Sequence, residues 1–361
     1  MYDAVLQIPI VGMGVEAFLL LLIASLAGGA FGAAIGALPA FIFTGFVVFL
    51  GEGVAILQRQ IGGLEAVPKG ELAVGLTGVI GFGAVTGPHI AFAGGVAASA
   101  YAGKKYPEME PDGWDYHFGK NILYAFGTKP DILAVGAVFG VLGMLIAKIA
   151  GGIGFPTDGI ALSVFLTAMI ARVAFDYPLV GKAAGESLLD MSPFEREEPH
   201  AAADGGEVPQ EHAGRLATEP WLPHQYKWSG VTAIGLVGGV LGGFIWIQTG
   251  SIFLGYAISA ISLLFLQLGV EKIPVTHHIT LMGAVGAVVA MPVVGSDPIA
   301  VIVAGLFGAA AGLLGEVTQR IFYSHSGTHV DPPAMAIVIV MFVVGVLFLL
   351  GVLPNDGYLA L

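Results

Sequence analysis

The chain has 361 residues, of which 56% are apolar and only 11% charged, so its apolar runs are long enough to cross a bilayer many times. The formal net charge of -12 without a basic patch argues against nucleic acid as a partner, and no cysteine is present for disulfides or thiolate metal sites. These features exclude a large soluble domain and predict an all-α polytopic membrane protein whose main partner is the lipid bilayer.

Apolar runs bounded by polar residues, Gly or Pro predict the helices. In chain order they cover residues 15–37, 39–58, 71–86, 88–103, 131–151, 156–176, 228–248, 250–269, 277–293, 298–316 and 334–353. The sequence therefore predicts about 11 transmembrane or re-entrant helices. The 55 glycines, many of them spaced by four, favour close helix crossings within the chain or a homo-oligomer through Gly-rich helix faces.

Basic residues indicate the orientation, because cytoplasmic loops carry the excess of Lys and Arg. Thirteen of the 14 Lys and Arg residues fall at the even-numbered connections, which share one side, and only Lys148 falls toward the other side. We therefore expect a multi-pass protein of the cell membrane with its N-terminus in the cytoplasm and its C-terminus outside. Residues 177–227 are polar and acidic, which predicts a poorly ordered cytoplasmic linker.

Five short motifs recur in the same order after about 200 residues, which predicts an internal duplication. The paired motifs begin at Gly28 and Gly235, Glu65 and Glu271, Gly75 and Gly283, Thr86 and Gly295, and Gly127 and Gly327. We expect residues 1–176 to form the first membrane repeat plus one extra helix, and residues 228–361 to form the second repeat. Six spans before the second copy would give both copies the same orientation, whereas a segment that does not span would invert them.

Matching interruptions break one apolar run in each copy, at Thr86-Gly87-Pro88-His89 and at Gly295-Ser296-Asp297-Pro298. The flanking segments are shorter than the roughly 20 residues of a full span, so each pair is either a re-entrant hairpin or two short spans joined by an external turn. Helix N-termini at the two prolines would favour a negative ligand group. The predicted substrate-binding residues are Thr86, Gly87, His89, Gly295, Ser296 and Asp297.

Glu52 and Asp297 are the candidate coupling residues. Glu52 lies well inside a full-length span, where a carboxylate is costly and usually functional, although Arg59 or interfacial water could also satisfy it. Asp297 has two readings, as a binding residue for Na+ or H+ and as a plain helix cap. No cofactor is predicted beyond such a coupling ion.

A further polar constellation, His325, His329 and Asp331, lies on the predicted cytoplasmic side together with His277 and His278. His and Asp suit a divalent metal. The surrounding Gly and Pro residues predict a loop, so we favour a gate formed by Asp131, His329 and Asp331, or plain helix capping by the two aspartates, over a metal site.

No nucleotide-binding loop or zinc-protease motif occurs, which argues against a primary pump within this chain. The sequence favours a secondary transporter (permease), not an enzyme, that moves a small solute across the membrane, with an anionic and ion-coupled solute as one option. The alternatives are an ion or small-solute channel on the same duplicated scaffold and a membrane metal-binding enzyme that uses the cytoplasmic histidines.

Overall fold

The computed structural model describes residues 7–61, 74–200, 208 and 212–361. Within these residues the chain is helical apart from turns and one short hairpin, in which β1 (Gln7–Ile8) pairs with β2 (Met13–Gly14). Seven of the described helices are long and apolar enough to cross a membrane, and two more are shorter but apolar. These lengths and compositions support the predicted all-α membrane class.

The helices follow the predicted apolar runs closely. The first half contains α1 (Val15–Ile35), α2 (Ala37–Ile61), the π-helix η2 (Val74–Gly81), the π-helix η3 (Pro88–Phe92), which runs directly into α4 (Ala93–Lys105), then α5 (Pro130–Gly152) and α6 (Gly159–Ala174). The second half contains α8 (Trp228–Thr249), α9 (Phe253–Gln267), α10 (His277–Val294), α11 (Asp297–Thr318) with its π-helical extension η8 (Gln319–Tyr323), and α12 (Pro332–Leu349). Short elements in the loops are η4 (Pro107–Met109), η5 (Phe118–Lys120) and α7 (Ser192–Glu195).

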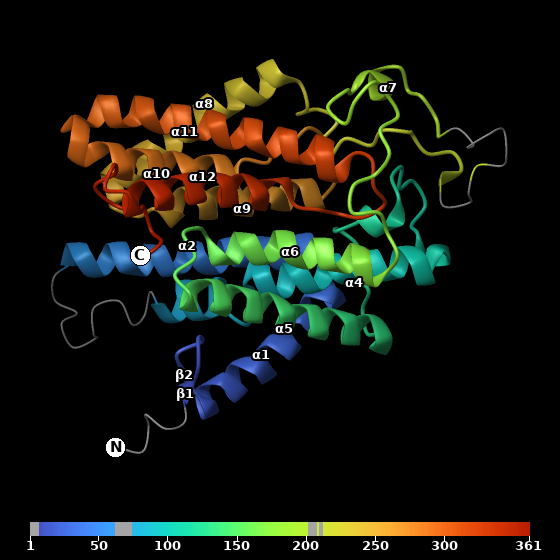
Figure 1. Cartoon of the computed structure of the whole chain (residues 1–361), viewed down its shortest axis with the longest axis horizontal. Helices are drawn as coiled ribbons and strands as arrows, with labels where there is room; N and C mark the ends of the chain where they lie inside the picture. The colour runs from blue at the N-terminus through green and yellow to red at the C-terminus, as the bar shows by residue number, and fades with distance from the viewer. Residues whose placement is uncertain (1–6, 62–73, 201–207, 209–211) are drawn as a thin grey trace.

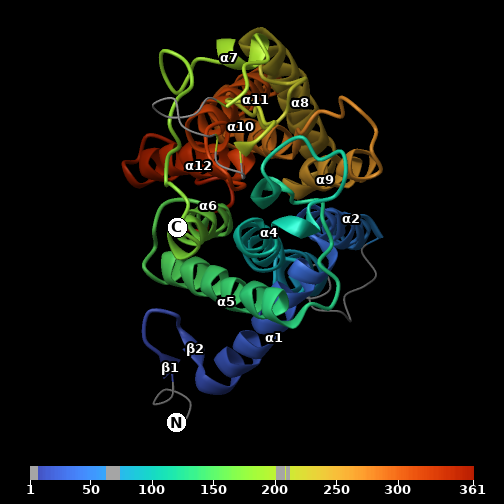
Figure 2. The same cartoon turned by 90° about the vertical axis from the view of Figure 1, so that its right-hand side faces the viewer.

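The two halves form two layers that pack against each other. In Figure 1 the first half lies below and the second half above, and Figure 2 shows the same division from the end of the molecule. The helices run between two ends. We call the end with loops 106–129, 175–227 and 324–331 the linker end, and the end with turns 153–158, 250–252 and 295–296 the turn end.

Both described terminal segments lie at the turn end. The backbone of Ile10 packs on Gly152 at the end of α5, and the hydroxyl of Tyr358 donates a hydrogen bond to Asp158 in the turn that follows α5. The α1–α2 turn lies instead at the linker end, because the amide of Leu38 donates to the carbonyl of Ile122. The described segments near the two ends of the chain thus lie at the same end of the helix bundle.

The predicted segment 71–86 is the main departure from the expected helices. Residues 71–73 lie outside the described residues, and the remainder forms η2 followed by turns at 82–87. Eight helical residues cover only about 12 Å, against about 30 Å of hydrocarbon. Thr77 lies beside Glu52 and Thr86 beside Thr44, so this segment runs antiparallel to α2 and stops within the helix bundle.

Glycines at the helix crossings explain how the helices approach so closely. A Cβ on Gly29 of α1 would overlap the backbone of Gly136 and Gly140 of α5, and one on Gly94 of α4 would overlap Gly29. In the second half, Gly239 of α8 lies against Gly283 of α10 and against α11 in the same way. These glycine faces are therefore used for packing within the chain.

The described part of the linker packs on the helices. The carbonyl of Leu189 accepts a hydrogen bond from Arg320, the Tyr177 hydroxyl donates to the carbonyl of Ala100, and the amide of Trp221 donates to the side chain of Gln319. The prediction of a poorly ordered linker is therefore wrong for residues 177–200 and 212–227. Backbone and side-chain partners at the linker end supply the contacts that its polar composition could not reveal.

Candidate functional site

A cavity of about 1380 Å³ lies between the two halves. Ligand pockets usually measure about 300–1,000 Å³, so this cavity has room for an organic molecule. Much of its wall is aromatic, with Phe41, Phe82 and Phe92 from the first half and Phe253, Tyr256 and Tyr323 from the second half. The ring of Phe41 lies 5.9 Å from those of both Phe92 and Tyr256, edge to face, so this wall joins the two layers.

Three histidines line the cavity with ring nitrogens that lack a partner. His89 on η3, His277 at the start of α10 and His329 before α12 are 6%, 5% and 1% exposed. Within the described residues, Nδ1 of each ring and Nε2 of His329 have no hydrogen-bond partner. A buried polar group left without a partner costs about 1–3 kcal/mol, so a ligand that bonds to these nitrogens would recover that free energy.

Two aspartates that line the cavity cap helices. Oδ1 of Asp158 accepts hydrogen bonds from the amides of Ile160 and Ala161 at the start of α6, and its Oδ2 accepts one from Tyr358 at 2.7 Å. Oδ2 of Asp331 accepts from the amide of Ala334 at the start of α12, and its Oδ1 lies 3.5 Å from Nε2 of His329. Both carboxylates are thus held by helix N-termini, where the helix dipole stabilises negative charge.

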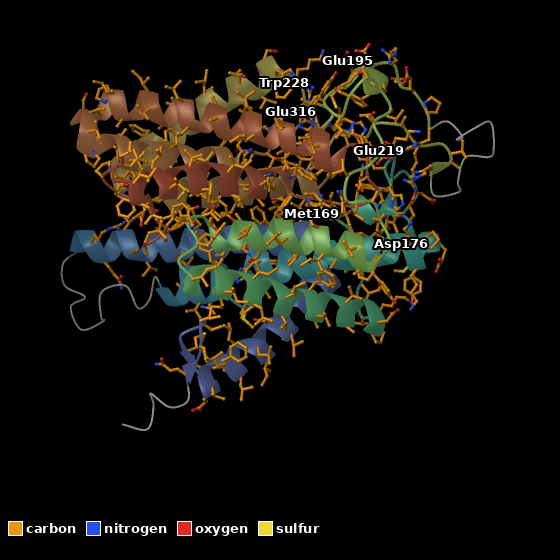
Figure 3. All side chains as sticks on the ribbon, in the orientation of Figure 1. Met169, Asp176, Glu195, Glu219, Trp228 and Glu316 are labelled. Atoms are coloured by element: carbon orange, nitrogen blue, oxygen red, sulfur yellow. The ribbon has the colours of Figure 1, made fainter. Side chains whose placement is uncertain are left out.

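At the linker end, the cavity-lining Lys120 belongs to a buried ion pair. Nζ of Lys120 lies 2.7 Å from Oε2 of Glu219, and the two side chains are 1% and 5% exposed. Figure 3 shows Glu219 among the loops of the linker end. Burial lowers the pKa of Lys120, and the nearby Glu219 carboxylate opposes that shift. This pair joins loop 106–129 to the linker where they line the cavity.

The sequence of the chain matches a protein-family profile over nearly its whole length. The profile of a family described as "Family of unknown function (DUF7973)" matches residues 10–361. The chain belongs to this family. The match includes both layers, the linker and every cavity residue named above. No curated protein and no solved structure matches the chain.

The two predicted interruptions do not form one site in this member of the DUF7973 family. Thr86, Gly87 and His89 are buried, and the Thr86 hydroxyl donates to the carbonyl of Ile80 at 3.0 Å. Gly295, Ser296 and Asp297 form the α10–α11 turn, where Gly295 and Asp297 are exposed and none of the three lines the cavity. The reason is helix length: α10 and α11 have 18 and 22 residues, so their turn reaches the surface, whereas the short η2 leaves its turn inside.

Glu52 has a structural environment away from the cavity. Its Oε1 accepts a hydrogen bond from Thr77 at 3.2 Å and its Oε2 accepts one from Ser251 at 2.6 Å. Arg59 does not satisfy it, because that guanidinium donates to the carbonyl of Thr249. The Glu52 side chain therefore joins α2 to η2 and to the α8–α9 turn, and this geometry does not favour a coupling role.

Asp131, the third predicted gate residue, lies apart from His329 and Asp331. It accepts hydrogen bonds from Tyr101, Tyr106 and Lys105 at the surface of the linker end and does not line the cavity. In the first half, Asp158 is the cavity-lining aspartate that precedes a helix, and the sequence reasoning missed it.

The predicted metal ligands also do not converge. Nε2 of His325 lies 3.1 Å from the carbonyl oxygen of Leu188, whereas His329 faces Asp331. Within the part of the chain that the structure describes, no group of three His, Asp or Glu side chains is placed to hold a metal ion. His278 packs against Gly315 and does not join such a group.

Proposed function

We propose that this protein is a secondary transporter that moves a small organic solute through the cavity between its two halves. The observation that carries this proposal is the cavity itself, which both halves line and which contains three buried histidines with ring nitrogens that lack a hydrogen-bond partner within the described residues. Solute sites at the interface of two membrane repeats are typical of transporters. Aromatic walls with a few convergent polar groups are typical of sites for organic ligands rather than for bare ions.

We further propose that the halves are repeats in a register different from the one predicted. Equivalent contacts support it: Gly28 lies against Ile90 and Gly32 against Ala91, as Gly238 lies against Ile279 and Gly242 against Thr280. The sequence agrees, because Gly28-Gly29-x-x-Gly32 matches Gly238-Gly239-x-x-Gly242, and His89-Ile90 matches His278-Ile279. The contacts do not support the pairing of Gly75 with Gly283, since Gly283 packs on Gly239 while a Cβ on Gly75 would meet no described atom within 4 Å.

In this register each repeat has five long segments, which are α1, α2, η3–α4, α5 and α6 in the first and α8 to α12 in the second. An odd number of crossings inverts the second copy, so that α1 runs toward the linker end and α8 away from it. Inverted repeats can exchange conformations, and each exchange would open the central cavity at the other end. This supports a carrier more than a channel, which needs one continuous path.

We propose that the linker end faces the cytoplasm, because it carries most of the basic residues. Cysteines introduced singly at Ser187, in the linker, and at Asp297, in the α10–α11 turn, are expected to react from opposite sides with a membrane-impermeant thiol reagent. The chain has no native cysteine, so the unmodified protein is the blank. Only the cysteine at 297 should react in intact cells; reaction of the one at 187 under the same conditions would reverse the proposed orientation.

Transport itself is tested by solute exchange. Proteoliposomes loaded with an extract of small metabolites and diluted into isotopically labelled extract should take up particular labelled solutes faster than vesicles loaded with buffer. A carrier exchanges internal for external solute faster than it moves net solute, so solute inside the vesicles stimulates uptake. A channel conducts without this stimulation. His277→Ala should lower the exchange rate at least about tenfold if this ring bonds to the solute. Asp297→Asn, at the exposed turn, is the control; equal loss in both variants, or uptake independent of internal solute, would contradict the carrier.

A further inference from the structure

The turn end of the cavity holds a basic side chain without a counter-ion. Lys148, near the end of α5, lines the cavity and lies within electrostatic range of His89. Within the described residues no carboxylate lies within ion-pair distance of Lys148, and Nδ1 of the buried His89 has no partner. A cation and an unpartnered imidazole thus face the same volume.

The helix that starts at this point adds a positive dipole end. Pro88 is its first residue, and η3 with α4 continues it to Lys105, so it is long enough to carry a macrodipole. No side chain caps its N-terminus at Gly87. Pro88 and His89 line the cavity, so this N-terminus lies at the cavity wall.

The carboxylate oxygens of Asp158, which lies at the same end, already accept hydrogen bonds. Asp158 accepts hydrogen bonds from two backbone amides and from Tyr358. The other aspartate and glutamate side chains that line the cavity, Asp331, Asp115 and Glu271, come from loops of the linker end. The side chains at the turn end that still lack a hydrogen-bond partner are therefore mainly donors. Donors suit an anionic group, which accepts hydrogen bonds.

The second repeat has a residue of opposite charge at the position of this lysine, a comparison that rests on the proposed function and its register. Gly140 of α5 packs on Gly29 and Ser25 of α1 as Gly308 of α11 packs on Gly239 and Gly235 of α8, which pairs Lys148 with Glu316. Arg320 lies 2.6 Å from Glu316, one turn earlier in its helix. The first repeat therefore has an unpaired cation where the second repeat has a carboxylate that is already paired.

We propose that the solute carries a carboxylate or phosphate group, and that Lys148, His89 and the N-terminus of η3–α4 bind this group while the aromatic wall holds an apolar body. Lys148 supplies charge, and His89 supplies a directional hydrogen bond in the buried part of the cavity. The solute is thus an amphipathic organic anion. The second repeat lacks such a site because the position that matches Lys148 is Glu316, a carboxylate paired with Arg320.

The proposal is tested on the purified full-length protein with probes of one shape and different charge. Benzoate and phenyl phosphate should each raise the melting temperature and quench tryptophan fluorescence, whereas benzamide and benzylammonium should do neither at the same concentrations. Whichever of the two anions binds more tightly distinguishes a carboxylate from a phosphate. Lys148→Gln and His89→Gln should each weaken its binding about tenfold or more. Lys182→Gln, an exposed lysine of the linker, is the charge-matched control.

The binding results test the anion site independently of the transport experiment. Equal binding of benzamide and benzoate, or unchanged anion binding in Lys148→Gln, would overturn it, even if exchange by proteoliposomes succeeds with a neutral solute. Anion binding that depends on Lys148 would stand even if no exchange is found. The melting temperature of each variant without probe shows whether it folds, and Lys148→Arg, which keeps the charge, should retain most of the affinity.

Discussion

Replacing Glu219 by alanine is expected to lower the free energy of unfolding by about 3–5 kcal/mol, because it leaves a buried ammonium group without its counter-ion. Lys120 is 1% exposed and its Nζ lies 2.7 Å from Glu219. The Glu219 carboxylate also accepts hydrogen bonds from the amide of His117, so the loss extends to the backbone of loop 106–129. Thermal unfolding of the purified variant measures the effect.

The pH dependence of this variant identifies its cause. Burial lowers the pKa of Lys120, and removing Glu219 removes an influence that raises it. The unfolded chain then binds more protons than the folded chain between the folded and unfolded pKa values of this lysine, so stability rises with pH in that interval. The deficit relative to the wild type should therefore shrink as the pH increases from 7 toward 10.

Matched variants separate the buried charge from other effects. Lys120→Met combined with Glu219→Leu removes both charges and should recover much of the lost stability, since apolar pairs often replace buried ion pairs without net loss. Glu198→Ala breaks the exposed pair with Arg196 and should cost less than about 1 kcal/mol. A double variant as unstable as Glu219→Ala would show that the backbone contacts, not the ion pair, dominate.

Helix positions could be predicted because membrane helices need long apolar runs, and these dominate the sequence. The interruption at Thr86 to His89 was also recognisable from Gly87 and Pro88, which end one helix and start the next. The matching interruption in the second half could not be recognised, since every repeat register in a glycine-rich chain produces several matches. The turn after η2 is buried and the α10–α11 turn is exposed because of the lengths of η2, α10 and α11. The apolar runs alone did not define these lengths.

The polar partners inside the cavity could not be predicted from spacing. Lys120 and Glu219 are 99 positions apart in two loops, and their approach depends on how the linker packs on the helices. His89 was predicted because it lies in an interruption of an apolar run, and His329 because it belongs to the polar group with His325 and Asp331; both line the cavity. The sequence also contains a signal for Asp158, because the proposed repeat register matches it with Asp331, and each precedes the last helix of its repeat.

Gly239→Ala is expected to cause the other large loss of stability, because three helices meet at this residue. The added Cβ would lie 2.9 Å from Cα of Gly308 and 3.0 Å from Cα of Gly305, both on α11, and Gly283 of α10 packs on the same glycine. The neighbours are backbone atoms, which cannot rotate away as a side chain does. We expect a cost at or above the upper part of the usual range of about 1–3 kcal/mol for overpacking.

The same helix offers the control. A Cβ on Gly230, in the first turn of α8, would meet no atom within 4 Å, so Gly230→Ala should be neutral or should stabilise the helix by about 0.5–1 kcal/mol. The melting temperatures of the two purified variants are compared in the same detergent. Because Gly29 packs on Gly136 and Gly140 of α5 as Gly239 packs on α11, Gly29→Ala should cause a loss similar to that of Gly239→Ala. Equal stability of Gly239→Ala and Gly230→Ala would mean that α8 does not cross α10 and α11 at this glycine, and the proposed repeat register would lose its main structural support.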